Sequence, residues 1–169
     1  TTGNSNVSVG DFSMNSNTTG SNNTAVGSQA LDQNTTASNN TAIGYEALGV
    51  NTTGVSNTAV GDRALDANTT ANYNTAVGGF ALTDNSTGAQ NTGIGYFALA
   101  GNQGANNNTA VGYNTMGSNT SGSGNTAVGQ GALDANTSGD ENAAFGQNAM
   151  STCTSGNSNV AVGRDCFFG

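Results

Sequence analysis

The sequence predicts an all-β protein, a parallel β-solenoid (β-roll) of ten coils with 17 residues in each coil. Two observations lead to this prediction. The pentapeptide Asn-Thr-Ala-Val-Gly, or a close variant of it, returns every 17 residues along the 169-residue chain without an insertion. The units are also rich in Asn, Thr and Gly and contain no proline. A fixed short period is typical of solenoids, whose units stack on one another, so we expect residues 1–169 to form one domain.

Each unit predicts short strands and tight turns. Cut at Thr1, the repeat reads Thr-Thr-Gly-x-x-Asn-Thr-Ala-Val-Gly-x-x-Ala-Leu-x-x-Asn, and its positions are called columns 1 to 17. We expect one strand over columns 6–10 and a second over columns 12–15. The absence of proline agrees with strands whose N–H groups all donate to neighbouring coils. A helix is disfavoured because every unit contains Gly, Asn and Thr and no apolar stripe with a 3.6-residue period.

Few columns are apolar. Column 9 holds Val, Ile or Phe, and column 14 holds Leu, Met or Phe. One unit cannot bury much alone, but stacked units share both columns, which we expect to form a continuous narrow core. We expect the threonines of column 7 to face partly inward, because Val replaces Thr at Val7 and Val160. Columns 4, 5, 11, 12, 15 and 16 vary freely and carry nearly all the charge, so we expect them to face water.

Column 6 is asparagine in all ten units. Asparagine tolerates unusual turn dihedrals and bonds nearby backbone. Identical asparagines stacked at one corner can also hydrogen-bond along the stack as a ladder. The predicted ladder residues are Asn6, Asn23, Asn40, Asn57, Asn74, Asn91, Asn108, Asn125, Asn142 and Asn159.

Column 10 is glycine in every unit, which predicts a corner that needs either a positive φ or a close approach of two backbones. The predicted corner residues are Gly10, Gly27, Gly44, Gly61, Gly78, Gly95, Gly112, Gly129, Gly146 and Gly163.

The charge excludes several classes of partner. The net charge of −8 comes from ten acids against two cations, Arg63 and Arg164. Two cations cannot neutralise a phosphate backbone, which argues against nucleic acid as a partner. No apolar run approaches the ~18 residues of a membrane span, so we expect no membrane insertion. The chain lacks histidine and lysine, and no group of acids recurs, so we expect no catalysis and no cofactor.

Two small groups of residues allow more than one interpretation. Asp32, Asp66 and Asp134 share column 15 but not consecutive coils, so we expect solvated carboxylates rather than a metal site. Cys153 and Cys166 lie in columns 17 and 13 of adjacent coils. Either they form a disulfide that caps the last coil, or one is a small core residue and the other a surface thiol.

Asparagine and threonine columns also carry signals for surface functions. Column 17 contains seven glycosylation sequons, but we expect the asparagine of this column to serve the turn instead. The sequons begin at Asn17, Asn34, Asn51, Asn68, Asn85, Asn119 and Asn136. Stacked threonines in columns 1 and 2 suggest the face of an ice-binding solenoid, which is the alternative function. Against it, neighbouring residues in a strand point to opposite sides, so the two columns would give single ranks.

Two segments resemble a known repeat family. Ser5-Asn6-Val7-Ser8-Val9-Gly10 and Ser158-Asn159-Val160-Ala161-Val162-Gly163 resemble the SVAIG repeat of trimeric autotransporter adhesin heads of the YadA-like type. The longer units resemble the NTAVG repeats of phage-tail-fibre-like and related bacterial surface proteins. The resemblance covers all ten units. It implies a parallel β-roll that is left-handed, often trimeric and carried on an exposed fibre.

We therefore expect a structural, surface-display solenoid of an extracellular, cell-surface or virion fibre. The expected partner is another copy, stacked head to tail or in a homotrimer, and a glycan or host-surface receptor is a further candidate. The terminal coils are atypical, with Phe12 and Met14 in the first and Phe167 and Phe168 in the last. Solenoids need their end coils covered, so we expect these four residues at capping or assembly contacts.

Overall fold

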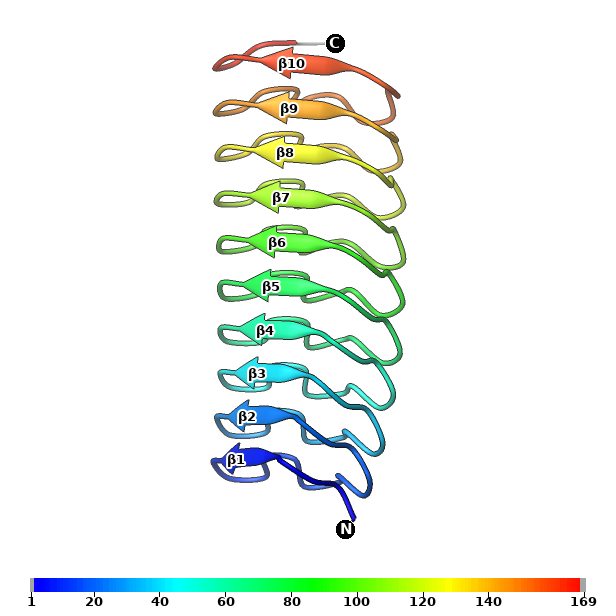
Figure 1. Ribbon diagram of the computed structural model, residues 1–169. Helices are drawn as coiled ribbons and strands as arrows, with labels where there is room; N and C mark the ends of the chain where they lie inside the picture. Colours follow the sequence, from blue (N-terminus) through cyan, green and yellow to red (C-terminus); the bar gives the residue numbers. More distant parts are fainter. Residues whose placement is uncertain (1, 168–169) are drawn as a thin grey trace.

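The computed structural model describes residues 2–167 and forms the predicted parallel β-solenoid (Figure 1). Ten three-residue strands form one sheet in the order β1 to β10. Neighbouring strands pair in parallel and in register, so that Thr58 lies opposite Thr75 and Val60 opposite Val77. The strands are β1 (Val7–Val9), β2 (Thr24–Val26), β3 (Thr41–Ile43), β4 (Thr58–Val60), β5 (Thr75–Val77), β6 (Thr92–Ile94), β7 (Thr109–Val111), β8 (Thr126–Val128), β9 (Ala143–Phe145) and β10 (Val160–Val162).

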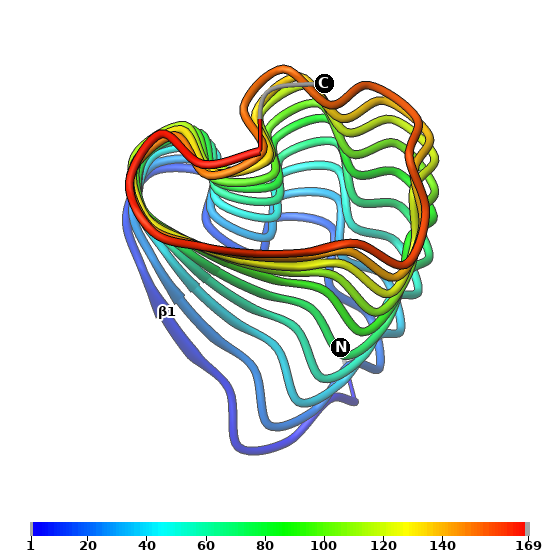
Figure 2. The same ribbon diagram turned by 90° about the horizontal axis from the view of Figure 1, so that it is seen from above.

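The coils stack into a rod with the two ends of the chain at opposite ends of the stack (Figure 1). Seen from the C-terminal end, the chain turns clockwise as it approaches the viewer, so the solenoid is left-handed (Figure 2). No helix occurs in residues 2–167, and so none in that range is long and apolar enough to cross a bilayer.

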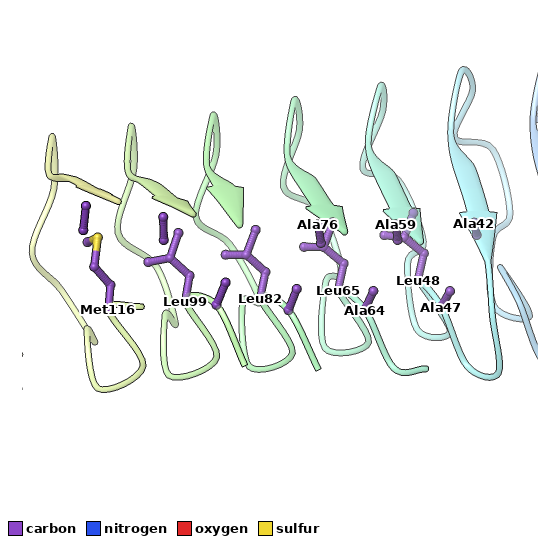
Figure 3. Packing of buried hydrophobic residues seen from close by; sticks show 14 of the residues in the cluster. Ala42, Ala47, Leu48, Ala59, Ala64, Leu65, Ala76, Leu82, Leu99 and Met116 are labelled. Atoms are coloured by element: carbon purple, nitrogen blue, oxygen red, sulfur yellow. The ribbon is translucent and has the colours of Figure 1, made fainter. Parts of the chain in front are cut away.

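The core is narrow and consists mainly of alanine and leucine. From β2 to β10 the middle residue of the strand, in column 8, is buried, and Ala42, Ala59 and Ala76 are fully buried. Column 14 supplies a file of Leu and Met side chains from the opposite wall of the coil, and Figure 3 shows this file as a row that runs from Leu48 to Met116. Alanines of column 13 fill the space beside them. The prediction that column 14 lies in the core is therefore confirmed.

The prediction that column 9 lies in the core is wrong. In β3, Ala42 is fully buried, whereas Ile43 is 40% exposed. The strand spans only columns 7 to 9, and successive side chains of a strand point to opposite faces. Since column 8 faces the core, columns 7 and 9 both face outward. The threonines of column 7, expected to face partly inward, point to the outer side but are partly buried there, as Thr58 and Thr75 are.

The predicted second strand over columns 12–15 is absent from the described residues. Every non-glycine residue there in columns 12 and 14 has a positive φ, for example Glu46 at 52° and Leu48 at 51°. An L-residue in the left-handed region cannot belong to an extended strand, so the chain runs through these columns as a series of turns. The turns still bond to the neighbouring coil, because the Leu48 N–H donates to the Ala64 carbonyl at 3.1 Å.

Both reasons proposed for the glycine corner are present together. Gly27 has a φ of +138°, and a Cβ at this position would lie 2.3 Å from the carbonyl oxygen of Gly44 in the next coil. The other glycines of column 10 share the positive φ. This corner closes the strand and directs the chain into the turns.

Candidate functional site

The column-6 asparagines form a ladder that joins side chains to backbone. The backbone N–H of Asn40 donates to Oδ1 of Asn23 at 2.9 Å, one coil below. Nδ2 of Asn23 donates to the carbonyl of Ala37 at 2.8 Å. The same pair of bonds recurs from coil to coil, and from Asn23 to Asn142 these side chains are buried. Each asparagine therefore satisfies buried backbone groups of the next coil and serves the stack rather than a ligand.

The column-17 asparagines form a second ladder that runs mostly from one side-chain amide to the next. Nδ2 of Asn34 donates to Oδ1 of Asn17 at 2.8 Å and to the Ala37 carbonyl at 3.1 Å. Six of the seven sequon asparagines have no exposed surface: Asn34, Asn51, Asn68, Asn85, Asn119 and Asn136. A glycan cannot be attached to a buried amide nitrogen of the folded chain, so the turn interpretation is supported at these six positions.

The two threonine ranks expected for ice binding differ from each other. Column-1 hydroxyls bond within the stack: Oγ1 of Thr52 donates to the carbonyl of Thr69 at 3.0 Å. These hydroxyls are therefore part of the scaffold. Column-2 threonines such as Thr53 and Thr70 are exposed. They form a single rank rather than a face.

A different surface emerges on the outer side of the sheet, which we call the strand face. It consists of the outward side chains of columns 7 and 9, two from each strand. Its residues are Val7, Val9, Thr24, Val26, Thr41, Ile43, Thr58, Val60, Thr75, Val77, Thr92, Ile94, Thr109, Val111, Thr126, Val128, Ala143, Phe145, Val160 and Val162. None of them is charged. The face is in register throughout, because all neighbouring strands pair directly.

Three of the acids lie at one place on the surface. Asp32, Glu46 and Asp66 line a shallow depression of about 180 Å³ beside Gly49. Burial, and next the negative charge of Glu46, raise the pKa of the Asp66 carboxyl. Among residues 2–167, no three Asp, Glu, Cys or His side chains are placed to hold a metal ion.

The predicted capping residues lie in different environments. Phe12 and Phe167 are exposed near the two ends of the rod, whereas Met14 is buried at the start of the leucine file. Phe168 lies outside the described residues. Cys153 and Cys166 are free thiols, half-buried against the end of the core. The Cys166 thiol lies 3.0 Å from the Gly163 carbonyl. Both cysteine side chains pack against the core, so the structure shows neither the disulfide nor an exposed surface thiol.

One cluster was not found from the sequence. The Phe80 and Phe97 rings stack at 5.2 Å between centroids, and the Tyr96 and Tyr113 rings stack at 6.0 Å. They come from columns 11 and 12 of three adjacent coils. The sequence does carry a signal for it, because 17 residues separate Phe80 from Phe97 and Tyr96 from Tyr113.

Comparison of the chain with protein-family models, with curated proteins and with solved structures gave no match. The fold therefore defines the class by itself: a left-handed parallel β-solenoid with two asparagine ladders and one uncharged sheet face. The resemblance to adhesin heads and tail fibres stays a prediction.

Proposed function

We propose that the chain is a structural rod of an extracellular, cell-surface or virion fibre, extended by head-to-tail stacking of copies. The regularity of the stack supports this proposal. Identical hydrogen bonds connect successive coils, and the side chains with chemical reactivity are scattered over the variable columns. Such a molecule provides length and stiffness, and it displays the same surface at every coil.

The observation that carries the proposal is the match between the two ends. Inside the stack, the column-7 N–H donates to the next coil's column-6 carbonyl, as Ala143 does to Asn159 at 2.8 Å. The column-10 N–H donates to the previous coil's column-9 carbonyl, as Gly163 does to Phe145 at 2.8 Å. Within residues 2–167, the outer edge of β10 leaves the N–H of Val160 and the carbonyl of Val162 without these partners.

The N-terminal coil offers the complementary groups. At the outer edge of β1, the Asn6 carbonyl and the Gly10 N–H lack the bonds that their equivalents make in later coils of residues 2–167. A second copy can therefore continue the sheet with the hydrogen bonds used inside each chain. Exposed sheet edges of this kind are templates for adding another strand.

Electron microscopy and sedimentation of the purified chain test the proposal. Wild-type protein is expected to form filaments one solenoid wide as its concentration rises. Val160→Pro removes the N–H donor of the open edge and is expected to leave single rods. Val160→Thr keeps both the donor and the β-branched shape, so it serves as the control and is expected to form filaments. A wild-type chain that stays a single rod at high concentration would refute head-to-tail stacking.

A further inference from the structure

The strand face is partly exposed, yet its residues do not vary as those of columns 11 and 12 do. Column 7 is threonine in seven consecutive coils from Thr24 to Thr126, and column 9 is Val, Ile or Phe in all ten. Columns 11 and 12, by contrast, change freely among charged, polar and aromatic residues, whereas exposed column 2 also stays uncharged, with Thr, Ser or Gly. Strand propensity accounts for β-branched residues, but it does not require that charge be absent from every position. The uniformity of this face therefore points to a role beyond folding.

The face is also periodic in two directions. Coils follow one another at ~4.8 Å along the rod, and columns 7 and 9 are separated by ~6.6 Å along each strand. Column-1 hydroxyls donate to the next coil, as those of Thr35 and Thr52 do. The column-7 hydroxyls make no hydrogen bond within residues 2–167, and their half-exposed side chains face solvent. The result is a regular array of threonine hydroxyls alternating with methyl groups.

A second copy packed against the strand face fits these observations poorly. Two side-chain columns over ten coils give a strip of roughly 450 Å² from the strand spacings. Stable interfaces bury about 800 Å² on each partner. A dry contact between two sheets would also take the threonine hydroxyls away from water, at a cost unless each finds a new partner.

We propose that the strand face binds ice. Ice is a ligand with fixed repeats in two dimensions, so an equally regular protein surface is required to contact it at many points. Ordered water offers each threonine hydroxyl a hydrogen bond, and the methyl groups displace water that bonds poorly to them. The absence of charge removes groups that would hold a competing hydration shell. The ice-binding surface thus lies in columns 7 and 9 rather than in columns 1 and 2.

One coil provides a matched pair of variants. Thr75 lies on the strand face, and Thr70 of the same coil lies in exposed column 2. Thermal hysteresis and ice-crystal shape are measured for the wild type, Thr75→Lys and Thr70→Lys. Wild-type protein is expected to shape ice crystals and to lower their growth temperature. Thr75→Lys is expected to lose most of this effect, and Thr70→Lys to keep it. If Thr75→Lys does not melt like the wild type, Val77→Lys repeats the test in the same strand.

Three results would overturn the proposal. One is wild-type protein that leaves ice growth unchanged. Another is an equal loss in the Thr70 and Thr75 variants. The third is lateral association in sedimentation that Thr75→Lys abolishes without any effect on ice, which would assign the face to a second copy. The proposal does not depend on head-to-tail stacking, because Val160→Pro is expected to keep ice binding while it blocks filaments.

Discussion

The backbone N–H of Asn91 donates to Oδ1 of Asn74, one coil below, at 2.9 Å. Asn74 also donates through Nδ2 to the carbonyl of Gly88 at 2.8 Å. One buried side chain thus satisfies two backbone groups of the following coil, at the start of its strand and in its return turn. This relationship recurs along the stack and explains why column 6 never changes.

Replacing Asn74 tests the ladder. Asn74→Ala should lower the free energy of unfolding by about 1–3 kcal/mol, because it leaves the buried N–H of Asn91 unpaired. The Gly88 carbonyl keeps its second bond, from Nδ2 of Asn85 at 2.9 Å. Chemical denaturation measures the change. Gln103→Ala, which shortens an exposed amide side chain, should stay within ~0.5 kcal/mol of the wild type. Similar losses in the two variants would contradict the role given to the ladder.

The glycine corner should tolerate no side chain. A Cβ on Gly78 would lie 2.5 Å from the carbonyl oxygen of Gly95, at a φ of +133°. We expect Gly78→Ala to cost at least ~3 kcal/mol, since left-handed strain adds to a clash between backbones. Gly79→Ala meets only the ring of Tyr96, which is exposed and can move, so it should cost less than ~1 kcal/mol. Thermal melts that rank the two variants in the opposite order would show the corner to be misassigned.

Column 12 offers a stabilising change. Gln29 has a φ of 60°, a conformation that costs an L-residue ~1–2 kcal/mol, whereas glycine adopts it freely. Gln29→Gly should therefore raise stability by up to ~1 kcal/mol after the entropic cost of glycine, ~0.5–1 kcal/mol, is subtracted. Gly131, in the same column, already has a φ of 63°. Ser28→Gly, one residue earlier, has no such strain to relieve and should lower stability. A loss at both positions would argue against strain in column 12.

The pH dependence follows from Asp66. Burial, and next Glu46, raise the pKa of its carboxyl, so the folded chain binds this proton more readily than the unfolded chain. The contribution of Asp66 to stability should therefore increase as the pH falls from neutral towards the ordinary Asp pKa of about 3.9, and change no further below it. Asp66→Asn should raise the melting temperature at pH 7, because it removes a half-buried charge. It should also reduce the increase in stability that the wild type shows as the pH falls.

Asp84→Asn removes the same charge from an exposed position and controls for net charge. It should change the melting temperature less than Asp66→Asn does. If the two variants behave alike at pH 7, the effect belongs to the total charge of the chain rather than to the burial of Asp66.

Residue types and their spacing were enough to predict the period, the parallel stacking and the two invariant columns. A 17-residue unit with one Leu and one Val cannot form a core alone, so stacking follows from the repeat. The chemistry of asparagine and glycine likewise predicted a ladder at Asn74 and a corner at Gly78. These features depend on residue type and spacing, which can be read without coordinates.

Which columns face the core became known only from the folded chain. Val77 and Leu82 are similarly apolar, yet Leu82 is fully buried and Val77 is 37% exposed. The direction of a side chain depends on the backbone dihedrals of the turns on either side of a three-residue strand. Leu82, at a φ of 53°, points inward from a conformation that its residue type does not favour. The hydrophobicity of the residues alone therefore could not predict that the threonine and valine columns form an outer strand face. Contacts between coils impose the turn dihedrals on which the direction of these side chains depends.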